Sequence, residues 1–351
     1  MSSFHKLSVA NITRETADSV SIRFNIPEHL KDTFQFKAGQ YITLKTNIDG
    51  KEIRRDYSLC VAPNSKELKV AVKEVEDGTF SAYANRTLKV GDTLEVASPK
   101  GRFIFTPNDS KIKNIVLFAA GSGITPVMSI LKCALEEEKE SKVVLMYGNK
   151  SVEDTMFMEE LLQLQHQYKD RFSIQFIFSR VKEKDALFGH IEKSTVNLVL
   201  KNKYKHIDVD AFYICGPEPM IHTVKAVLDE NGIAEDRVHF ELFKASKQDE
   251  VEDTSAPTDK TTITITLDEE TTTFEMSPSQ SILEAALDED LDAPYSCQGG
   301  ICSTCLARLK EGEAKMRQNN ILTDQEVEDG LILTCQAHPT SSKVVIDYDD
   351  V

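Results

Sequence analysis

The chain has 351 residues, of which 40% are hydrophobic and 28% charged, an ordinary globular composition in a chain too long for one hydrophobic core. Its net charge of −16 argues against nucleic acid as a partner, and no apolar run approaches the roughly 20 residues of a membrane span. The start of the chain lacks the apolar core of a secretory signal, so we expect a cytoplasmic protein with two or three domains.

Residues 1–107 have the pattern of an all-β domain. Short runs such as SVSIRFNI, QYITLKT and KELKVAVKEV alternate apolar and polar side chains and are rich in Val, Ile, Thr and Tyr. Turn signals such as Asp49-Gly50 and Asp77-Gly78 separate the runs. Several short strands at this spacing predict an antiparallel barrel or sandwich.

Two short segments of this domain could bind a flavin nucleotide. Arg55, Tyr57 and Ser58 lie on one predicted strand, where they could contact a phosphate, a planar ring and a ring nitrogen. Gly78 and Ser81 open a predicted short helix, whose free N–H groups could bind a pyrophosphate. Taken alone, either segment also fits an ordinary strand surface or an ordinary helix start.

Residues 108–245 alternate predicted strands with predicted helices. NIVLFAA is a continuous apolar run, as in a buried parallel strand, and KVVLMYG, FSIQFIFS and AFYICG repeat the pattern. Helices are predicted after Gly121-Ser122-Gly123, from about Asp154 to Tyr168, and from about Glu218 to Glu230. This alternation predicts a doubly wound parallel sheet.

Two glycine-rich strand ends fall on the carboxyl edge of this predicted sheet, where such folds bind ligands. Gly121, Gly123, Thr125 and Pro126 follow the first strand and open a helix, and Cys215-Gly216-Pro217 ends a later strand. Glycines let the backbone approach a phosphate. The third glycine of G-x-G-x-x-G is missing, so the usual dinucleotide fingerprint is not met.

The ends of the second and third strands bear on which nicotinamide would bind. NAD-binding sheets place an acid near the end of the second strand, and here no acid occurs before Glu153. Lys150 follows that strand and Arg180 follows the third, so two cations could hold the 2′-phosphate of NADPH. Both could equally be solvated surface residues. We expect NADPH rather than NADH.

Residues 246–260, SKQDEVEDTSAPTDK, predict a linker, and residues 261–351 a separate acidic domain. TITITL and TTTFEM form a predicted hairpin around Asp268-Glu269-Glu270, followed by a helix in SILEAALDED and a last strand in VVIDYD. This segment has 18 acidic and 5 basic side chains, a net −13, against 39 and 36 in the rest of the chain. The acidity is either a solvated surface or a face that steers the docking of a basic partner.

The last segment holds four of the seven cysteines: Cys297, Cys302, Cys305 and Cys335. Their spacing, Cys-x4-Cys-x2-Cys with 29 residues before the fourth, is the plant-type [2Fe–2S] pattern. Small residues in SCQGGICSTC allow a tight loop around inorganic sulfide. Zinc, the alternative for four thiolates, uses two closely spaced pairs, and disulfides are rare in a reducing compartment. Cys60 and Cys133 are predicted core residues.

Taken in order, RDYS, GTFS, GSGITP, CGPEPM and PYSCQGGICSTC resemble the ferredoxin–NADP reductase superfamily with a C-terminal plant-type ferredoxin, over essentially the whole chain. The resemblance implies an FAD-binding β-barrel in residues 1–107 and a NAD(P)-binding α/β domain in 108–245. It further implies a linker in 246–260 and an α+β, β-grasp ferredoxin domain in 261–351.

The resemblance also implies roles for individual residues. Ser58, Cys215 and Glu241 would take part in catalysis, and the four cysteines of the last segment would bind the cluster. Phe243, in HFELF, would approach the flavin, with simple core packing as the alternative. The family more commonly has Arg where Lys150 stands. The residues that would bind FAD or NADPH are Arg55, Tyr57, Ser58, Gly78, Ser81, Gly121, Gly123, Thr125, Pro126, Lys150, Arg180, Cys215, Gly216, Pro217 and Phe243.

The activity implied is an oxidoreductase that passes electrons from NADPH through FAD and the cluster to a separate oxygenase. FHKLSVANITRET, RRDYSLC and the domain order are most similar to reductase components of phenylacetyl-CoA epoxidases, which act in phenylacetate degradation. Reductases of other multicomponent oxygenases or hydroxylases remain alternatives. A non-enzymatic iron–sulfur carrier is another, against which the intact Gly121, Gly123, Gly216 and Ser58 argue. A self-contained oxygenase would need a His/carboxylate metal cluster, which is not evident.

Overall fold

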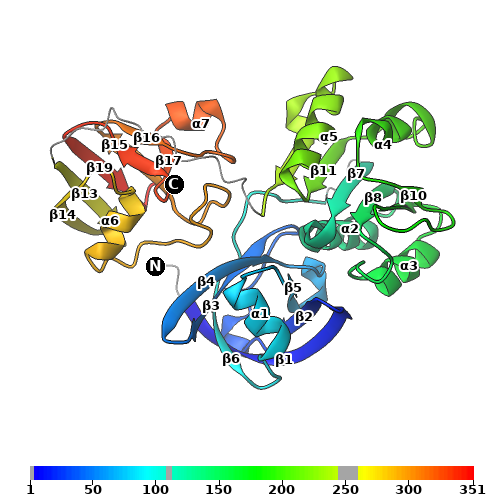
Figure 1. Cartoon of the computed structure of the whole chain (residues 1–351), viewed down its shortest axis with the longest axis horizontal. Helices are drawn as coiled ribbons and strands as arrows, with labels where there is room; N and C mark the ends of the chain where they lie inside the picture. Colours follow the sequence, from blue (N-terminus) through cyan, green and yellow to red (C-terminus); the bar gives the residue numbers. More distant parts are fainter. Residues whose placement is uncertain (1–3, 108–112, 244–259) are drawn as a thin grey trace. The chain divides into compact units, whose positions relative to one another are not determined.

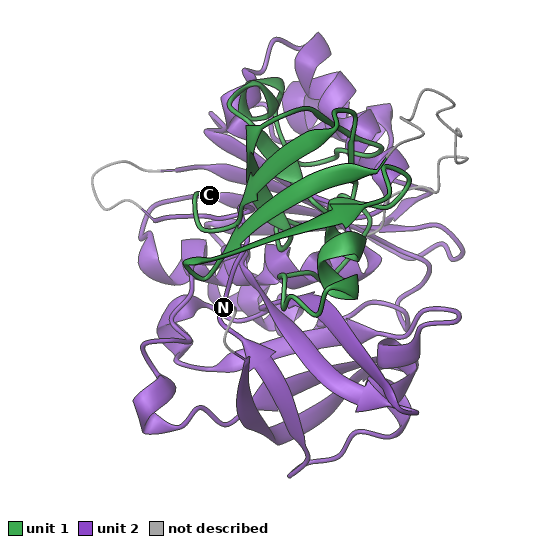
Figure 2. Ribbon diagram, turned by 90° about the vertical axis from the view of Figure 1, so that its left-hand side faces the viewer, with its two compact units in different colours: residues 1–3, 244–351 green, residues 4–243 purple. Residues whose placement is uncertain are grey.

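The computed structural model of the protein describes residues 4–107, 113–243 and 260–351 (Figure 1). The predicted linker, 246–260, lies outside the described residues except for Lys260. The chain divides into two compact units, one of residues Phe4–Phe243 and one whose main described part is residues 260–351 (Figure 2). No helix in the described ranges is long and apolar enough to span a membrane.

The first unit begins with six strands: β1 (Phe4–Thr16), β2 (Ser19–Phe24), β3 (Tyr41–Ile48), β4 (Lys51–Ser58), β5 (Leu68–Lys73) and β6 (Thr93–Ala97). They pair antiparallel in the order β4-β3-β6-β1-β2-β5. An antiparallel bridge between Leu59, just after β4, and Val70 of β5 joins the two outer strands, so the sheet closes as the predicted barrel. Short 3-10 turns, Glu28–Leu30 and Pro63–Ser65, lie in the connections.

Helix α1 (Thr79–Arg86) covers part of the barrel core (Figure 1). It begins after Gly78, as predicted, and its Phe80 and Ala84 are buried among the inward side chains of the strands. The alternation that predicted strands places Ile22 and Val70 in this core, since every second residue of a strand faces the same side.

The same unit continues with a second sheet, formed by β7 (Ile115–Ala120), β8 (Val143–Asn149), β9 (Phe172–Phe178), β10 (Leu187–Phe188), β11 (Ala211–Cys215) and β12 (Val238–Glu241). All its pairings are parallel, in the order β10-β9-β8-β7-β11-β12. The order reverses between β7 and β11, which is where open α/β sheets bind ligands.

Helices flank the parallel sheet. Helices α2 (Ile124–Glu137) and α3 (Met158–Gln167) pack on one side, and α4 (Lys193–Asn197) and α5 (Glu218–Glu230) lie on the other (Figure 1). A 3-10 turn at Gly121–Gly123 leads into α2, a π-helical turn at Leu198–Asn202 follows α4, and a 3-10 turn at Glu235–Arg237 precedes β12. Helices α2 and α5 match the prediction, whereas α3 begins four residues later than expected and β10 and α4 were not predicted.

One hydrophobic core joins the barrel to the parallel sheet. Phe103 and Phe105, after β6, pack with α2 and with the facing side of the sheet. The Ser129 hydroxyl of α2 donates to the Val61 carbonyl oxygen at 2.7 Å, and Lys132 Nζ donates to the Cys60 carbonyl oxygen at 3.3 Å. These contacts fix the end of β4 relative to α2. Cys60 and Cys133 are buried core residues, as predicted.

Within residues 260–351 the second unit has seven strands: β13 (Thr261–Leu267), β14 (Glu270–Met276), β15 (Leu306–Glu311), β16 (Ala314–Met316), β17 (Leu331–Leu333), β18 (Ala337–Pro339) and β19 (Lys343–Asp347). Five form a mixed sheet in the order β14-β13-β19-β15-β17, and β16 pairs with β18. Helix α6 (Ile282–Asp288) packs its apolar side chains into the core, and a short α7 (Asp324–Glu328) precedes β17. This is the predicted α+β arrangement.

Local sequence explains the first hairpin and helix of this unit. Asp268 and Glu269 both have positive φ, as a tight turn between β13 and β14 requires, and both N–H groups donate to the Asp349 carboxylate. Helix α6 starts with a capping box, in which Ser281 and Glu284 bind each other's backbone N–H.

Candidate functional site

The two predicted glycine-rich strand ends meet at the reversal point of the parallel sheet. A Cβ on Gly123 would lie 2.2 Å from the Cys215 carbonyl oxygen, and one on Gly216 would lie 3.1 Å from the Ala120 backbone nitrogen. Gly121 has a φ of +54°, which favours glycine. The glycines therefore let the turns after β7 and β11 touch.

Thr125 and Pro126 lie in the first turn of α2, where their side chains are buried. The Thr125 hydroxyl donates to the Ser122 carbonyl oxygen at 3.1 Å and is thus engaged within the helix start. Pro217 caps the N-terminus of α5 in the same way that Gly123 precedes α2. The groups that these two helix starts offer a dinucleotide are mainly backbone N–H donors, which suit phosphate oxygens.

The three predicted catalytic residues converge beside this edge. Cys215 ends β11 and pairs in register with Glu241, which ends β12. Ser58 ends β4, and its hydroxyl lies 3.5 Å from a Glu241 carboxylate oxygen. The structure therefore brings a hydroxyl, a thiol and a carboxyl from three strands to one place.

Burial dominates the electrostatics of this group. Desolvation, helped by the charge of Asp56 and opposed by the Ser58 hydrogen bond, raises the pKa of Glu241 to about 8. Burial and the Glu241 charge raise the pKa of the Cys215 thiol well above its usual value. At neutral pH the site therefore holds a neutral thiol and a largely protonated carboxyl.

Asp56 was not predicted as part of this site. It lies two residues before Ser58 on β4, so the two side chains share a face of the strand. The Thr43 hydroxyl, on the neighbouring strand β3, donates to Asp56 at 2.6 Å. The alternation of β4 could have placed Asp56 beside Ser58, but its effect on Glu241 depends on how the barrel packs against β12.

Arg55 and Tyr57 lie on the other face of β4. Arg55 is exposed, and the Tyr57 ring packs against Phe80 of α1 with centroids 5.3 Å apart. A cation and an aromatic ring beside a helix start suit the anionic and planar parts of a flavin nucleotide.

Gly78 and Ser81 shape the start of α1. A Cβ on Gly78 would lie 2.2 Å from the Ser81 hydroxyl oxygen, so the turn has no room for a side chain there. The Ser81 hydroxyl donates to the Gly78 carbonyl oxygen and accepts from the Val75 N–H, both at 3.2 Å. Any contact of Ser81 with a pyrophosphate therefore falls to its backbone N–H.

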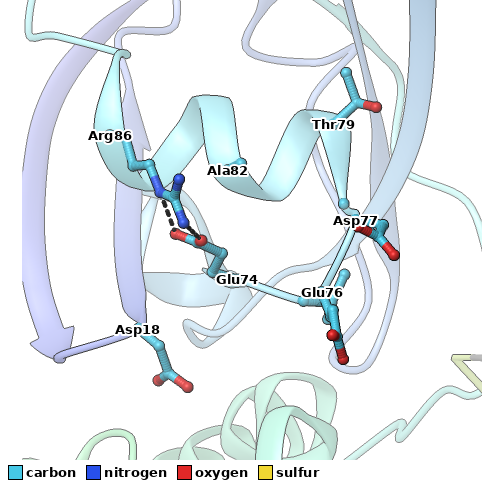
Figure 3. A pocket seen from close by; sticks show the side chains of 9 residues that line it. Asp18, Glu74, Glu76, Asp77, Thr79, Ala82 and Arg86 are labelled. Atoms are coloured by element: carbon cyan, nitrogen blue, oxygen red, sulfur yellow. Dashed lines mark hydrogen bonds and ion pairs between the residues drawn. The ribbon is translucent and has the colours of Figure 1, made fainter.

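A cavity of about 560 Å³ is lined by the start of α1, at Gly78 and Thr79, and by Ala82 and Arg86 further along the helix (Figure 3). Carboxylates dominate its lining, and its one cation, Arg86, pairs with Glu74. Four acids oppose the binding of a free anion in this cavity, so the groups here that favour a phosphate are the backbone N–H groups of the helix start. The acids are Asp18, Glu74, Glu76 and Asp77.

Lys150 and Arg180 lie side by side beyond the ends of β8 and β9. The Arg180 N–H donates to the Lys150 carbonyl oxygen at 2.9 Å, which continues the pairing of the two strands. Both side chains are exposed. The predicted pair of cations therefore exists at the carboxyl edge of the sheet, open to a ligand.

Phe243 is 41% exposed and belongs to the exposed large hydrophobic residues of the described chain. Simple core packing, the alternative interpretation of this residue, is therefore wrong.

The four cysteines of the last segment form two pairs. The Cys302 thiol donates to Cys297 Sγ at 3.1 Å, and a hydrogen bond joins Cys305 to Cys335. The Cys302 thiol and the N–H groups of Gly299, Ile301 and Cys302 lower the pKa of Cys297 to about 6. Two cysteine pairs with backbone donors fit a [2Fe–2S] cluster, in which each iron takes two protein ligands.

Comparisons with known proteins agree along the whole chain. Residues 6–105 match the oxidoreductase FAD-binding domain, 117–226 the oxidoreductase NAD-binding domain, and 265–340 the 2Fe-2S iron-sulfur cluster binding domain. The chain is 35% identical to one of the subunits of the 1,2-phenylacetyl-CoA epoxidase of Escherichia coli K12, over 99% of both chains. It belongs to the ferredoxin–NADP reductase superfamily, with a C-terminal plant-type ferredoxin.

Two further relatives match this chain over nearly its whole length. The ferredoxin reductase component of 3-ketosteroid-9-alpha-monooxygenase from Rhodococcus rhodochrous is 34% identical, over 97% of this chain and 96% of its own. The solved structure of phthalate dioxygenase reductase superposes with a TM-score of 0.62 at 27% identity, over 98% of both chains. The reductase described here is an oxidoreductase with FAD-, NAD- and [2Fe–2S]-binding domains, an electron-transfer component of multicomponent oxygenases.

Proposed function

We propose that this reductase uses NADPH and supplies electrons to the oxygenase component of a phenylacetyl-CoA epoxidase. The 35% identity to one of the subunits of such an epoxidase, over 99% of both chains, supports the partner. A ketosteroid monooxygenase reductase at 34% identity is nearly as similar, so the rival acceptor is the oxygenase of another system. The proposed domains, 1–107, 108–245 and 261–351, enclose the three matched segments.

The observation that supports the electron path is that one chain contains both a nucleotide-type site and a candidate cluster site. Ser58, Cys215 and Glu241 converge beside the edge of a dinucleotide-type sheet, and four cysteines form two pairs in the second unit. When bound, FAD exchanges two electrons with a nicotinamide and the cluster carries one at a time, so the cofactors supply the redox chemistry. The protein holds and orients them.

Residues of the barrel would hold FAD. Arg55 would pair with its pyrophosphate, together with the backbone N–H groups at the start of α1 after Gly78 and at Ser81. Tyr57 would lie against the ring system or the ribityl chain, and Phe243 would approach the ring from the end of the first unit. The exposed guanidinium of Arg55 and the exposed ring of Phe243 support these assignments.

Residues at the edge of the parallel sheet would hold NADPH. The N–H groups that follow Gly121, Gly123 and Gly216 would bind phosphate, and the starts of α2 at Thr125–Pro126 and of α5 at Pro217 would bracket the nicotinamide. Lys150 and Arg180 would pair with the 2′-phosphate, for which the two adjacent, exposed cations are the supporting observation.

The Ser58 hydroxyl and the Glu241 carboxyl would orient the reacting rings. Because the pKa of Glu241 is raised to about 8, its carboxyl is largely neutral at pH 7 and can donate a hydrogen bond. Cys215 would contribute a neutral, close-packed thiol beside it. None of these groups needs to become charged for the site to work.

An anaerobic titration with NADPH tests the electron path. We expect the flavin absorbance to bleach and the EPR signal of a reduced [2Fe–2S] cluster to grow. A bleached flavin without that signal would rule out internal transfer. In a Cys302→Ala variant, ferricyanide reduction should persist while cytochrome c reduction is lost, and the core variant Cys133→Ala should keep both.

Reconstitution tests the partner. The reductase should support NADPH-dependent turnover of phenylacetyl-CoA when mixed with the oxygenase component of the epoxidase. Full cytochrome c reduction with no epoxidation would assign the reductase to another oxygenase, such as a steroid hydroxylase.

A further inference from the structure

Ser296 is a buried hydroxyl without a hydrogen-bond partner in the described part of the chain. It directly precedes Cys297 and is 3% exposed, and its Oγ finds no acceptor or donor. Nearly all buried polar side chains in proteins have at least one partner, because water is no longer available to them. We therefore expect the Ser296 hydroxyl to have a hydrogen-bond partner that is not part of the described polypeptide.

Other polar groups of the same loop do have partners. The Gly299 N–H donates to Cys297 Sγ at 3.3 Å, and the Asn320 N–H donates to the Gly300 carbonyl oxygen at 3.2 Å. The side chain of Gln336 donates to the Gln298 carbonyl oxygen at 2.9 Å.

The far end of the loop is bound just as closely. The Thr334 hydroxyl donates to the Cys305 carbonyl oxygen at 3.0 Å and accepts from the Tyr348 hydroxyl at 2.9 Å. These polar groups of the loop are hydrogen-bonded, whereas the buried hydroxyl of Ser296 is not. We take this difference to point to a bound group as its partner.

The chemistry of that group follows from the neighbouring cysteines. Cys297 already receives hydrogen bonds from backbone N–H groups, and these donors remain when Cys302 binds iron as a thiolate. Inorganic sulfide in an iron–sulfur cluster is a further acceptor, and a serine hydroxyl can rotate about its Cβ–Oγ bond to donate to it.

We propose that the Ser296 hydroxyl donates a hydrogen bond to a sulfur of the [2Fe–2S] cluster and raises the cluster's reduction potential. The inference rests on the proposed ligand set of Cys297, Cys302, Cys305 and Cys335. Reduction adds negative charge to the cluster, and a hydrogen-bond donor stabilises the more negative form. Ser296 is then a tuning residue of the acceptor end of the electron path.

A redox titration monitored by EPR on the full-length protein tests the proposal. In Ser296→Ala the ratio of reduced to oxidised cluster at a fixed potential should fall about tenfold, equivalent to about 59 mV for one electron. Ser296→Thr keeps a hydroxyl and should titrate like the wild type. The control Ser279→Ala, which removes an exposed hydroxyl of the same unit, should leave the potential unchanged.

Resonance Raman spectra in D2O supply a second readout that does not depend on turnover. The Fe–S bands of the wild type should shift on deuteration, and part of that shift should be lost in Ser296→Ala. A Ser296→Ala protein with the wild-type potential and the wild-type deuterium shift would overturn the proposal.

Measuring how much [2Fe–2S] cluster each variant contains distinguishes the outcomes in which a variant loses the cluster. Loss of the cluster from Ser296→Ala with full incorporation in Ser296→Thr also supports a role for the hydroxyl. Loss from both variants overturns the proposal, because side-chain volume would then be what limits the site. A wild-type protein without any [2Fe–2S] signal would instead refute the proposed function, and thus the two failures are distinguishable.

Discussion

The Ser58 hydroxyl lies 3.5 Å from a carboxylate oxygen of Glu241, although the two residues are 183 positions apart. This distance is at the long limit of a hydrogen bond, as is common for catalytic contacts before a ligand binds. The contact joins the last residue of a barrel strand to the last residue of the parallel sheet. It can form because Ser129 and Lys132 of α2 donate to the backbone just beyond β4.

The first prediction concerns Ser58→Ala. Loss of a hydrogen bond that orients the reacting rings should lower the rate of NADPH-dependent ferricyanide reduction about tenfold to a hundredfold. FAD content and the EPR signal of a chemically reduced cluster should stay as in the wild type. Stopped-flow measurement of flavin bleaching reports the affected step directly.

The control for Ser58→Ala is Ser194→Ala, which removes an exposed hydroxyl from the same unit and should leave the rate unchanged. Equal flavin bleaching rates in Ser58→Ala and the wild type would mean that the hydroxyl has no part in the reaction.

The second prediction concerns the pH dependence of the reaction. Glu241, with its pKa raised to about 8 by burial, is protonated at neutral pH and ionises as the pH rises through that value. Ionisation removes its ability to donate and puts a negative charge beside Ser58. The rate of flavin reduction by NADPH should therefore fall above about pH 8, and in Glu241→Gln this fall should be absent.

Unfolding by urea gives an independent check on Glu241. Its folded-state pKa of about 8 lies above the ordinary value of 4.5, so the native state holds the proton more tightly than the unfolded chain. The stability linked to this proton is complete below pH 4.5 and is lost as the pH rises through 8. Relative to Glu241→Gln, the wild type should lose at most about 1.4 kcal/mol per pH unit in that window. A constant difference would contradict the raised pKa.

The fold of the parallel sheet could be predicted because its strands are continuous apolar runs and glycines mark where they end. The six-residue β7 is an unbroken apolar run, and Gly121–Gly123 ends it before α2. The start of α3 was predicted four residues early, because Ser151 and Thr155 bind locally in a turn that competes with helix. The two-residue β10 and the five-residue α4 are too short to show a period.

Only those parts of the candidate site that belong to short sequence motifs, or that follow from the order of these motifs, could be predicted. The cysteine spacing identifies the cluster segment, and family motifs bring Ser58 and Glu241 into one hypothesis. The influence of Asp56 on Glu241 and the unpartnered hydroxyl of Ser296 depend on packing between distant segments. Burial and hydrogen-bond satisfaction are properties of the folded chain, so no local pattern reveals them.

The third prediction concerns the choice of nicotinamide. Removal of either cation, in Lys150→Ala or Arg180→Ala, should lower kcat/KM for NADPH about tenfold to a hundredfold, because each would lose a charge-assisted hydrogen bond. The value for NADH should not change, since NADH lacks the 2′-phosphate. Steady-state ferricyanide reduction with both nucleotides measures the two values.

Two further variants sharpen this test. Lys150→Arg keeps the positive charge, and its planar guanidinium can bind phosphate with two hydrogen bonds. The kcat/KM for NADPH should therefore stay the same or rise. Lys205→Ala removes an exposed cation elsewhere in the unit and should change neither value. A wild type that prefers NADH would contradict the assignment of both cations.

The fourth prediction concerns the acidity of the second unit. Residues 261–351 carry a net charge of −13, and four exposed acids follow one another closely at the end of α6: Asp288, Glu289, Asp290 and Asp292. If these charges steer the reductase to a basic face of its acceptor, electron transfer to the oxygenase should slow as salt rises, because ions screen the attraction beyond about 10 Å at 0.1 M.

Neutralising the four acids to Asn or Gln separates steering from solvation. The variant should transfer electrons more slowly than the wild type at low salt, and the two rates should converge at high salt, where screening has already removed the attraction. Stopped-flow reduction of the oxygenase over a salt series measures both. The charges would affect the association of the reductase with the oxygenase. The second-order rate constant for reduction of the oxygenase should therefore change, while the rate of electron transfer from flavin to cluster within the reductase should not. A flat salt profile in the wild type would leave the acidity as a solvated surface only.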